Sequence, residues 1–176
     1  SNVACEVACT VTASRLVINE VDYDDASSDD DEFIELYNPT ASAIVLEGLA
    51  VVLFNGANGE EDGRVALTGS LPPGAYYVVS PAGSSVTGDA ELPRSPQNGS
   101  PDGVGILETS SDTLIDFVTW EGEVSPAEVT LDGGTEVTLP AGMNVSIGED
   151  PASGTQDNPV FESLIRVIDG CDTGMP

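Results

Sequence analysis

The sequence contains no histidine and no lysine, and four arginines supply all of its positive charge. Histidine is the commonest general base and a frequent zinc ligand, so its absence excludes Ser-His-Asp and Cys-His catalytic arrangements. The absence of lysine excludes a Ser-x-x-Lys pair. A hydrolase built on paired carboxylates or clustered metal ions stays open, because acidic residues are abundant. We expect a protein that is not an enzyme.

The charge balance is strongly one-sided, with 31 acidic residues and a formal net charge of −27. Nucleic-acid binding depends on Lys and Arg that neutralise phosphates, so we predict no nucleic-acid partner. Anionic lipid headgroups are repelled in the same way. Metal cations or cationic partners fit this charge, and improved solubility is the alternative explanation.

Long apolar runs are also missing, and none reaches the ~18 residues of a membrane-spanning helix, so we predict no membrane insertion. The three cysteines, Cys5, Cys9 and Cys171, all lie near the ends of the chain. We expect a disulfide among them and an exported protein. Ser1-Asn2 resembles the remnant of a cleaved tag, and the ending DGCDTGMP suggests that the chain continues further. We therefore expect tails over 1–14 and 169–176 around one domain over 15–168.

Short β-branched and apolar runs, separated by Gly, Pro, Asn, Asp and Ser, recur along the chain. No segment keeps a helical period for ten or more residues. The pattern predicts an all-β sandwich or barrel. The expected strands are 15–22, 32–38, 43–46, 49–55, 64–68, 75–80, 104–108, 113–120, 135–139, 144–148 and 160–168.

Alternation along the first two strands predicts where their side chains point. Leu16, Ile18, Glu20 and Asp22 are expected to share one face of the first strand. In the second strand, Ile34 and Leu36 are expected to share a face with Glu32. If the two strands pair, Glu20, Asp22 and Glu32 should converge at one end of the sheet.

Two further features have competing interpretations. Residues 81–103 form a long polar segment, for which a flexible surface loop is favoured over a binding role. Trp120 is the only tryptophan, and a core position is favoured over a ligand contact.

Several blocks of the sequence resemble one known family. LVINEVDYDDASSDDDEFIELYNPTASAIVLEGLAVV is similar to the opening of a bacterial lamin tail domain, with its I-N-E-V strand, acidic loop and E-F-I-E-L-Y-N-P strand. LPPGAYYVVS, DGVGILETSSDTLIDFVTW and NVSIGEDPASGTQDNPVFESL resemble later parts of that family, so that the resemblance covers about residues 16 to 168. Two departures are Leu49-Ala50, where the family usually has a tryptophan, and a longer segment over 121–143.

The resemblance implies an immunoglobulin-like β-sandwich without catalytic activity. It also implies an interaction module, which in bacteria occurs on secreted and cell-surface proteins. Fold alone does not name a function.

The acidic segment between the first two strands is a candidate Ca²⁺ site. Seven of the twelve residues in DYDDASSDDDEF are acidic, and Asp22, Asp24, Asp29 and Glu32 match acids of the family in a D-Y-D-x-x-x-x-D-x-x-E arrangement. Ca²⁺ takes six to eight oxygen ligands in flexible geometry, and Glu20 is a further candidate. The pattern is not an EF-hand, because Phe33 occupies the twelfth position. A solvated acidic loop is the alternative, and Asp25, Asp30 and Asp31 are assigned to solvent.

These observations predict a secreted or cell-surface interaction or adhesion module that binds Ca²⁺ through Glu20, Asp22, Asp24, Asp29 and Glu32. Its protein or cell-surface partner is not identified by the sequence. Two alternatives stay open: a purely structural spacer domain of a larger surface protein, and a metal-dependent hydrolase fragment.

Overall fold

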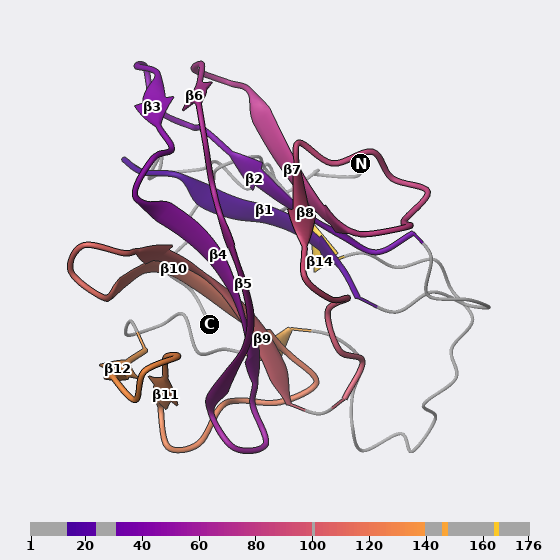
Figure 1. Cartoon of the computed structure of the whole chain (residues 1–176), viewed down its shortest axis with the longest axis vertical. Helices are drawn as coiled ribbons and strands as arrows, with labels where there is room; N and C mark the ends of the chain where they lie inside the picture. The colour runs from indigo at the N-terminus through magenta and orange to yellow at the C-terminus, as the bar shows by residue number, and fades with distance from the viewer. Residues whose placement is uncertain (1–13, 24–30, 100, 140–145, 148–163, 166–176) are drawn as a thin grey trace, which may run out of the picture.

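The computed structural model describes residues 14–23, 31–99, 101–139, 146–147 and 164–165. These residues form fourteen strands and no helix, arranged as two facing sheets (Figure 1), and the predicted all-β sandwich is confirmed. In the described part of the chain, no helix is long and apolar enough to cross a membrane.

The first sheet has five strands in the order β14-β1-β2-β7-β8. Their bounds are Leu164–Ile165 for β14, Val17–Asp22 for β1, Phe33–Tyr37 for β2, Tyr76–Pro81 for β7 and Ala90–Leu92 for β8. All neighbours pair antiparallel except β7 and β8, which are parallel.

The second sheet has seven strands in the order β12-β11-β5-β4-β9-β10-β13. Their bounds are Glu136–Thr138 for β12, Glu128–Thr130 for β11, Glu60–Ala66 for β5, Leu49–Asn55 for β4, Asp102–Glu108 for β9, Thr113–Trp120 for β10 and Ser146–Ile147 for β13. A small ribbon of β3 (Ile44–Val45) and β6 (Ser70–Leu71) stands apart from both sheets.

The main core fills the space between the two sheets. Alternate residues of β4 and β9, such as Val51, Leu53, Val104 and Ile106, point into it from the second sheet. Trp120 is 1% exposed and belongs to the same cluster, so its predicted core position is confirmed.

A second core lies on the outer face of the seven-stranded sheet. The other residues of β4, including Val52 and Phe54, meet Phe117 of β10 and side chains of residues 124–139, which carry β11 and β12. Residues 124–139, within the segment 121–143 that looked longer than usual in the sequence, therefore cover this face. β4 is buried on both sides, which agrees with the continuously apolar run LAVVLF that precedes Asn55.

Two glycines of β9 make room for this second core. A Cβ atom on Gly105 would lie 2.7 Å from Leu114 Cδ2, and one on Gly103 would lie 3.0 Å from Phe117 Cζ. These contacts are tighter than real Cβ atoms tolerate without movement. The glycines in DGVGIL thus have a packing role.

Each sheet contains a β-bulge, and one carboxylate joins the two. The β1–β2 register shifts between Ile18 and Glu20, and the β10–β9 register shifts between Leu114 and Asp116. Asp116 is 2% exposed, and its Oδ2 accepts a hydrogen bond of 2.7 Å from the Ile18 amide of the other sheet. Arg15 lies 3.9 Å from the second carboxylate oxygen of Asp116.

Every strand expected from the sequence overlaps a strand of the structure. The strands β6, β8 and β11 were missed, as were the first residues of β5 and of β9. The interpretation of 81–103 as a flexible surface loop is wrong at Ala90–Leu92, which forms β8 and places Leu92 in the core, and at Asp102–Gly103, which begins β9.

We predict that Gly105→Ala destabilises the protein by about 1–3 kcal/mol, because the added methyl group overlaps Leu114. Urea unfolding measures the loss. Leu114→Ala removes the obstructing atoms, so Gly105→Ala should cost less in that background. Strictly additive losses would contradict this account of the glycine.

We also predict that Asp116→Ala costs about 2–4 kcal/mol in unfolding free energy, since it leaves the buried Ile18 amide without its carboxylate acceptor. Asp116→Asn keeps an acceptor oxygen and should cost less. The matched control is Glu136→Ala, which removes an exposed carboxylate from β12. Equal losses for Asp116→Ala and Glu136→Ala would contradict the anchoring role.

Candidate functional site at the acidic loop

The candidate site lies where β1 ends and β2 begins. Glu20, Asp22 and Glu32 are within the described residues, whereas Asp24 and Asp29 lie outside them. Asp25 and Asp30 also lie outside the described residues. So do Cys5, Cys9 and Cys171, and the disulfide therefore stays a prediction.

The predicted facing of Glu20 and Asp22 is wrong. The bulge inserts Asn19 as an extra residue in β1 and shifts the alternation by one residue. Leu16 and Ile18 before the bulge face the core, and after it Val21 and Tyr23 face the core. Glu20 and Asp22 are half-buried on the opposite, outer face, where Glu20 pairs with Glu35 and Asp22 pairs with Phe33.

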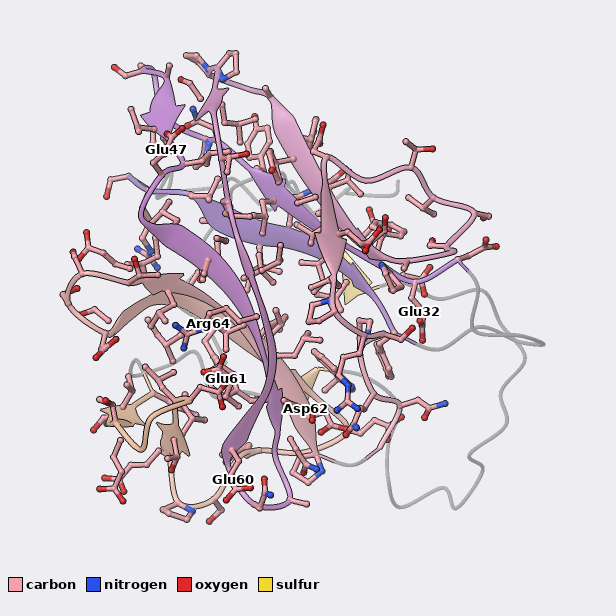
Figure 2. All side chains as sticks on the ribbon, in the orientation of Figure 1. Glu32, Glu47, Glu60, Glu61, Asp62 and Arg64 are labelled. Carbon is pink, nitrogen blue, oxygen red and sulfur yellow. The ribbon has the colours of Figure 1, made fainter. Side chains whose placement is uncertain are left out.

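Glu32 follows the predicted alternation with Ile34 and Leu36. It is 1% exposed and precedes β2 on the core side of the sheet. Figure 2 shows it at the margin of the sandwich opposite to Glu47. Asp22 and Glu32 therefore share one end of the strand pair but approach it from different faces, and Glu20 lies further back along β1.

The segment after β7 holds the start of β2. Ser85 donates a hydrogen bond to the Asp31 carboxylate, and Ser84 Oγ donates one of 3.4 Å to the Glu32 carbonyl. Asp31, which the sequence assigned to solvent alone, is exposed but also bonded to this segment.

Aromatic packing supports the other side of the loop. The Tyr23 ring stacks on Trp120 with centroids 5.1 Å apart and an interplanar angle of 23°. The Trp120 indole Nε1 donates a hydrogen bond of 2.9 Å to the Gln97 carbonyl. Tyr23 directly follows Asp22, so the last residue of β1 is anchored next to a rigid aromatic pair.

Three arginines in the described residues form ion pairs with acids, one within β5 and two with acids of other elements. Arg64 lies 2.6 Å from Glu61 on β5, Arg94 pairs with Asp62, and Arg15 pairs with Asp116. Figure 2 shows Arg64 and Glu61 together on one side of β5. The Glu61 hydrogen bond raises the pKa of Arg64. The chain has only one other positive side chain, so its own cations cannot neutralise seven acids between residues 22 and 32.

Within the described ranges, no group of three or more Cys, Asp or Glu is placed to hold a metal ion. Because two of the five proposed ligands lie outside those ranges, the calcium site stays a prediction.

Besides Asp116, two acids with buried side chains were not indicated by the sequence pattern. Glu61 accepts hydrogen bonds from Arg64 and from the Asp132 amide at 2.8 Å, which ties the segment covering the outer face to β5. Asp102 is 3% exposed, and burial raises its pKa to about 6. Glu61 precedes the expected strand 64–68, and Asp102 stood in the segment 81–103 expected to be a loop.

The fold and the loop can be compared with known proteins. Comparison with curated proteins finds no match to the chain. Residues 10–122, more than half of the sequence, match the Lamin Tail Domain family, and the match ends just before the segment that covers the outer face. The β-sandwich agrees with the fold of that family. The chain therefore belongs to the lamin tail domain family.

Proposed function

We propose that this lamin tail domain is a non-catalytic interaction or adhesion module of a secreted or cell-surface protein, and that it binds Ca²⁺ at its acidic loop. The concentration of acids in that loop, in a chain with only four arginines, is the observation that carries the proposal. Seven acids lie between residues 22 and 32, and three of the four arginines pair with acids on β5 and β10. A bound cation would relieve the repulsion.

The strand ends favour a particular set of ligands. Asp22 is the last residue of β1 and Glu32 immediately precedes β2, so both border the loop. Asp22 and Glu32 could both bind an ion that lies beyond the end of the strand pair, one from each face of the sheet. Asp24 and Asp29 of the loop would complete the set of ligands. Glu20 is two residues further back, about 7 Å along the strand, and is the least favourable of the five ligands.

The absence of histidine and lysine supports the non-catalytic part of the proposal. The high negative charge supports a metal ion or a cationic protein surface as the partner, rather than nucleic acid or anionic lipid. A purely structural spacer would have the same fold but would bind no ion. A measurement of Ca²⁺ binding therefore distinguishes the interaction module from the spacer.

We predict that calorimetric titration detects Ca²⁺ binding and that Asp22→Asn weakens it by about tenfold or more, because it removes a charged oxygen ligand. Glu20→Gln should have a smaller effect, owing to its distance from the strand end. The control is Glu136→Gln, an equal charge change on β12. Ionic strength is held constant with NaCl.

The melting temperature in Ca²⁺ should rise for the unaltered chain and for Glu136→Gln, and rise less for Asp22→Asn. No binding heat together with an unchanged melting temperature would favour the spacer function. Equal weakening by Asp22→Asn and Glu136→Gln would indicate diffuse screening of charge rather than a site.

We further predict no turnover of a phosphodiester substrate above the buffer rate, with Mg²⁺, Mn²⁺ or Ca²⁺ present. The sequence offers few cations to stabilise phosphate charge in the transition state. A rate that survives purification and is lost in Asp22→Asn would revive the metal-dependent hydrolase.

A further inference from the structure

Asp102 lies at the meeting point of three strand ends and two connections. It is the first residue of β9, and it pairs with Asn55 of β4 on one side and with Trp120 of β10 on the other. Its side chain is buried, although the β4–β5 turn and the connection from β8 both end beside it. Figure 1 shows this turn and the start of β9 together at the lower end of the molecule.

The Asp102 carboxylate holds both of these connections. The Gly56 amide of the β4–β5 turn donates a hydrogen bond of 3.3 Å to its Oδ1, and the Gly99 amide of the β8–β9 connection donates another to the carboxylate. The Trp120–Gln97 hydrogen bond holds the same connection two residues earlier. Asp102 is thus the shared acceptor that joins turn and connection.

Close packing leaves little room around these hydrogen bonds. A Cβ atom on Gly56 would lie 2.3 Å from the Pro101 carbonyl oxygen, and one on Gly122 would lie 2.9 Å from Pro101 Cβ. Pro101 is therefore held between the β4–β5 turn and the residues that follow β10. Lifting the connection away would open this packing and hydrate the carboxylate.

The charges around Asp102 oppose its ionisation. Asp62 of β5 and Glu121 after β10 both act on it as like charges. Arg94, in the β8–β9 connection, is ion-paired with Asp62. Burial is the largest cause of the raised pKa of about 6, and the Gly56 and Gly99 amides act in the opposite direction.

We propose that Asp102, with the Gly56 and Gly99 amides, forms a proton-dependent latch that fixes the β8–β9 connection to the β4–β5 turn, firmly when the carboxyl is protonated and less firmly when it is ionised between Asp62 and Glu121. The latch is independent of the proposed calcium site, and it acts on residues 93–99 rather than on the acidic loop.

The direction follows from proton linkage. In an opened form Asp102 is hydrated, and its pKa returns toward the ordinary value of 3.8, whereas in the closed form it is about 6. The closed form binds the proton more tightly, so its advantage is complete below about pH 4 and is lost as the pH rises through about 6. The population of the opened form should increase by about a hundredfold across this window.

Amide hydrogen exchange followed by NMR tests the latch at residues 56 and 99. After correction for intrinsic exchange rates, protection of the Gly99 amide should fall by about a hundredfold between about pH 4 and about pH 7. Core amides such as Val104 and Ile106 serve as the internal reference, and their protection should fall less. A parallel fall at all of these amides would mean global destabilisation and would overturn the latch.

Asp102→Asn should remove the pH dependence at Gly99, and Glu136→Gln should leave it as in the unaltered chain. If Asp102→Asn does not fold, Glu121→Gln gives the second test, because removing one like charge should move the transition to lower pH. A Gly99 protection that is constant with pH in the unaltered chain, or an Asp102 carboxyl that titrates near 3.8 by NMR, would also overturn the proposal.

Discussion

The hydrogen bond from the Ile18 amide to Asp116 is the contact on which the arrangement of this sandwich depends. It joins two strands in opposite sheets at the point where each carries an extra residue. A bulge leaves backbone groups without their ladder partners, and a buried amide without an acceptor is costly. The carboxylate supplies that acceptor and so keeps both bulges in place. The bulge in β1 in turn decides that Glu20 and Asp22 face outward.

This dependence explains why the fold could be predicted while the facing of the acids could not. β2 is visible in the sequence because its buried residues alternate with the period of a pleated sheet, and β4 because it is a short continuous apolar run. The extra residue Asn19 has no local signal, since Asp116, which accepts the hydrogen bond of the neighbouring Ile18 amide, lies on β10, distant in the chain. A shift of one residue exchanges the two faces of a strand. Predicted ligands after such a shift therefore move to the wrong side.

Other errors have similar physical causes. The start of β5 is charged and reads as a turn, but Glu61 is compensated by Arg64 and by the Asp132 amide. β8 has three residues and forms by parallel pairing with β7. No hydrophobic pattern in the sequence indicates this pairing. The outer-face segment lies beyond the region that matches the family, yet β4 and β9 within that region carry the apolar residues of the core that it completes. The covering of the outer face is therefore a feature of this chain that lies outside the residues matched to the family.

Trp120 has a spectroscopic consequence that follows from its position. It is the only tryptophan in the chain, and its ring contacts Tyr23 at the end of β1, while its indole nitrogen bonds to Gln97 and its backbone pairs with Asp102. The fluorescence of one native chromophore thus reports on the acidic loop border and on the neighbouring connection without any label. Because the indole is 1% exposed, a red shift of its emission signals entry of water at this end of the sandwich.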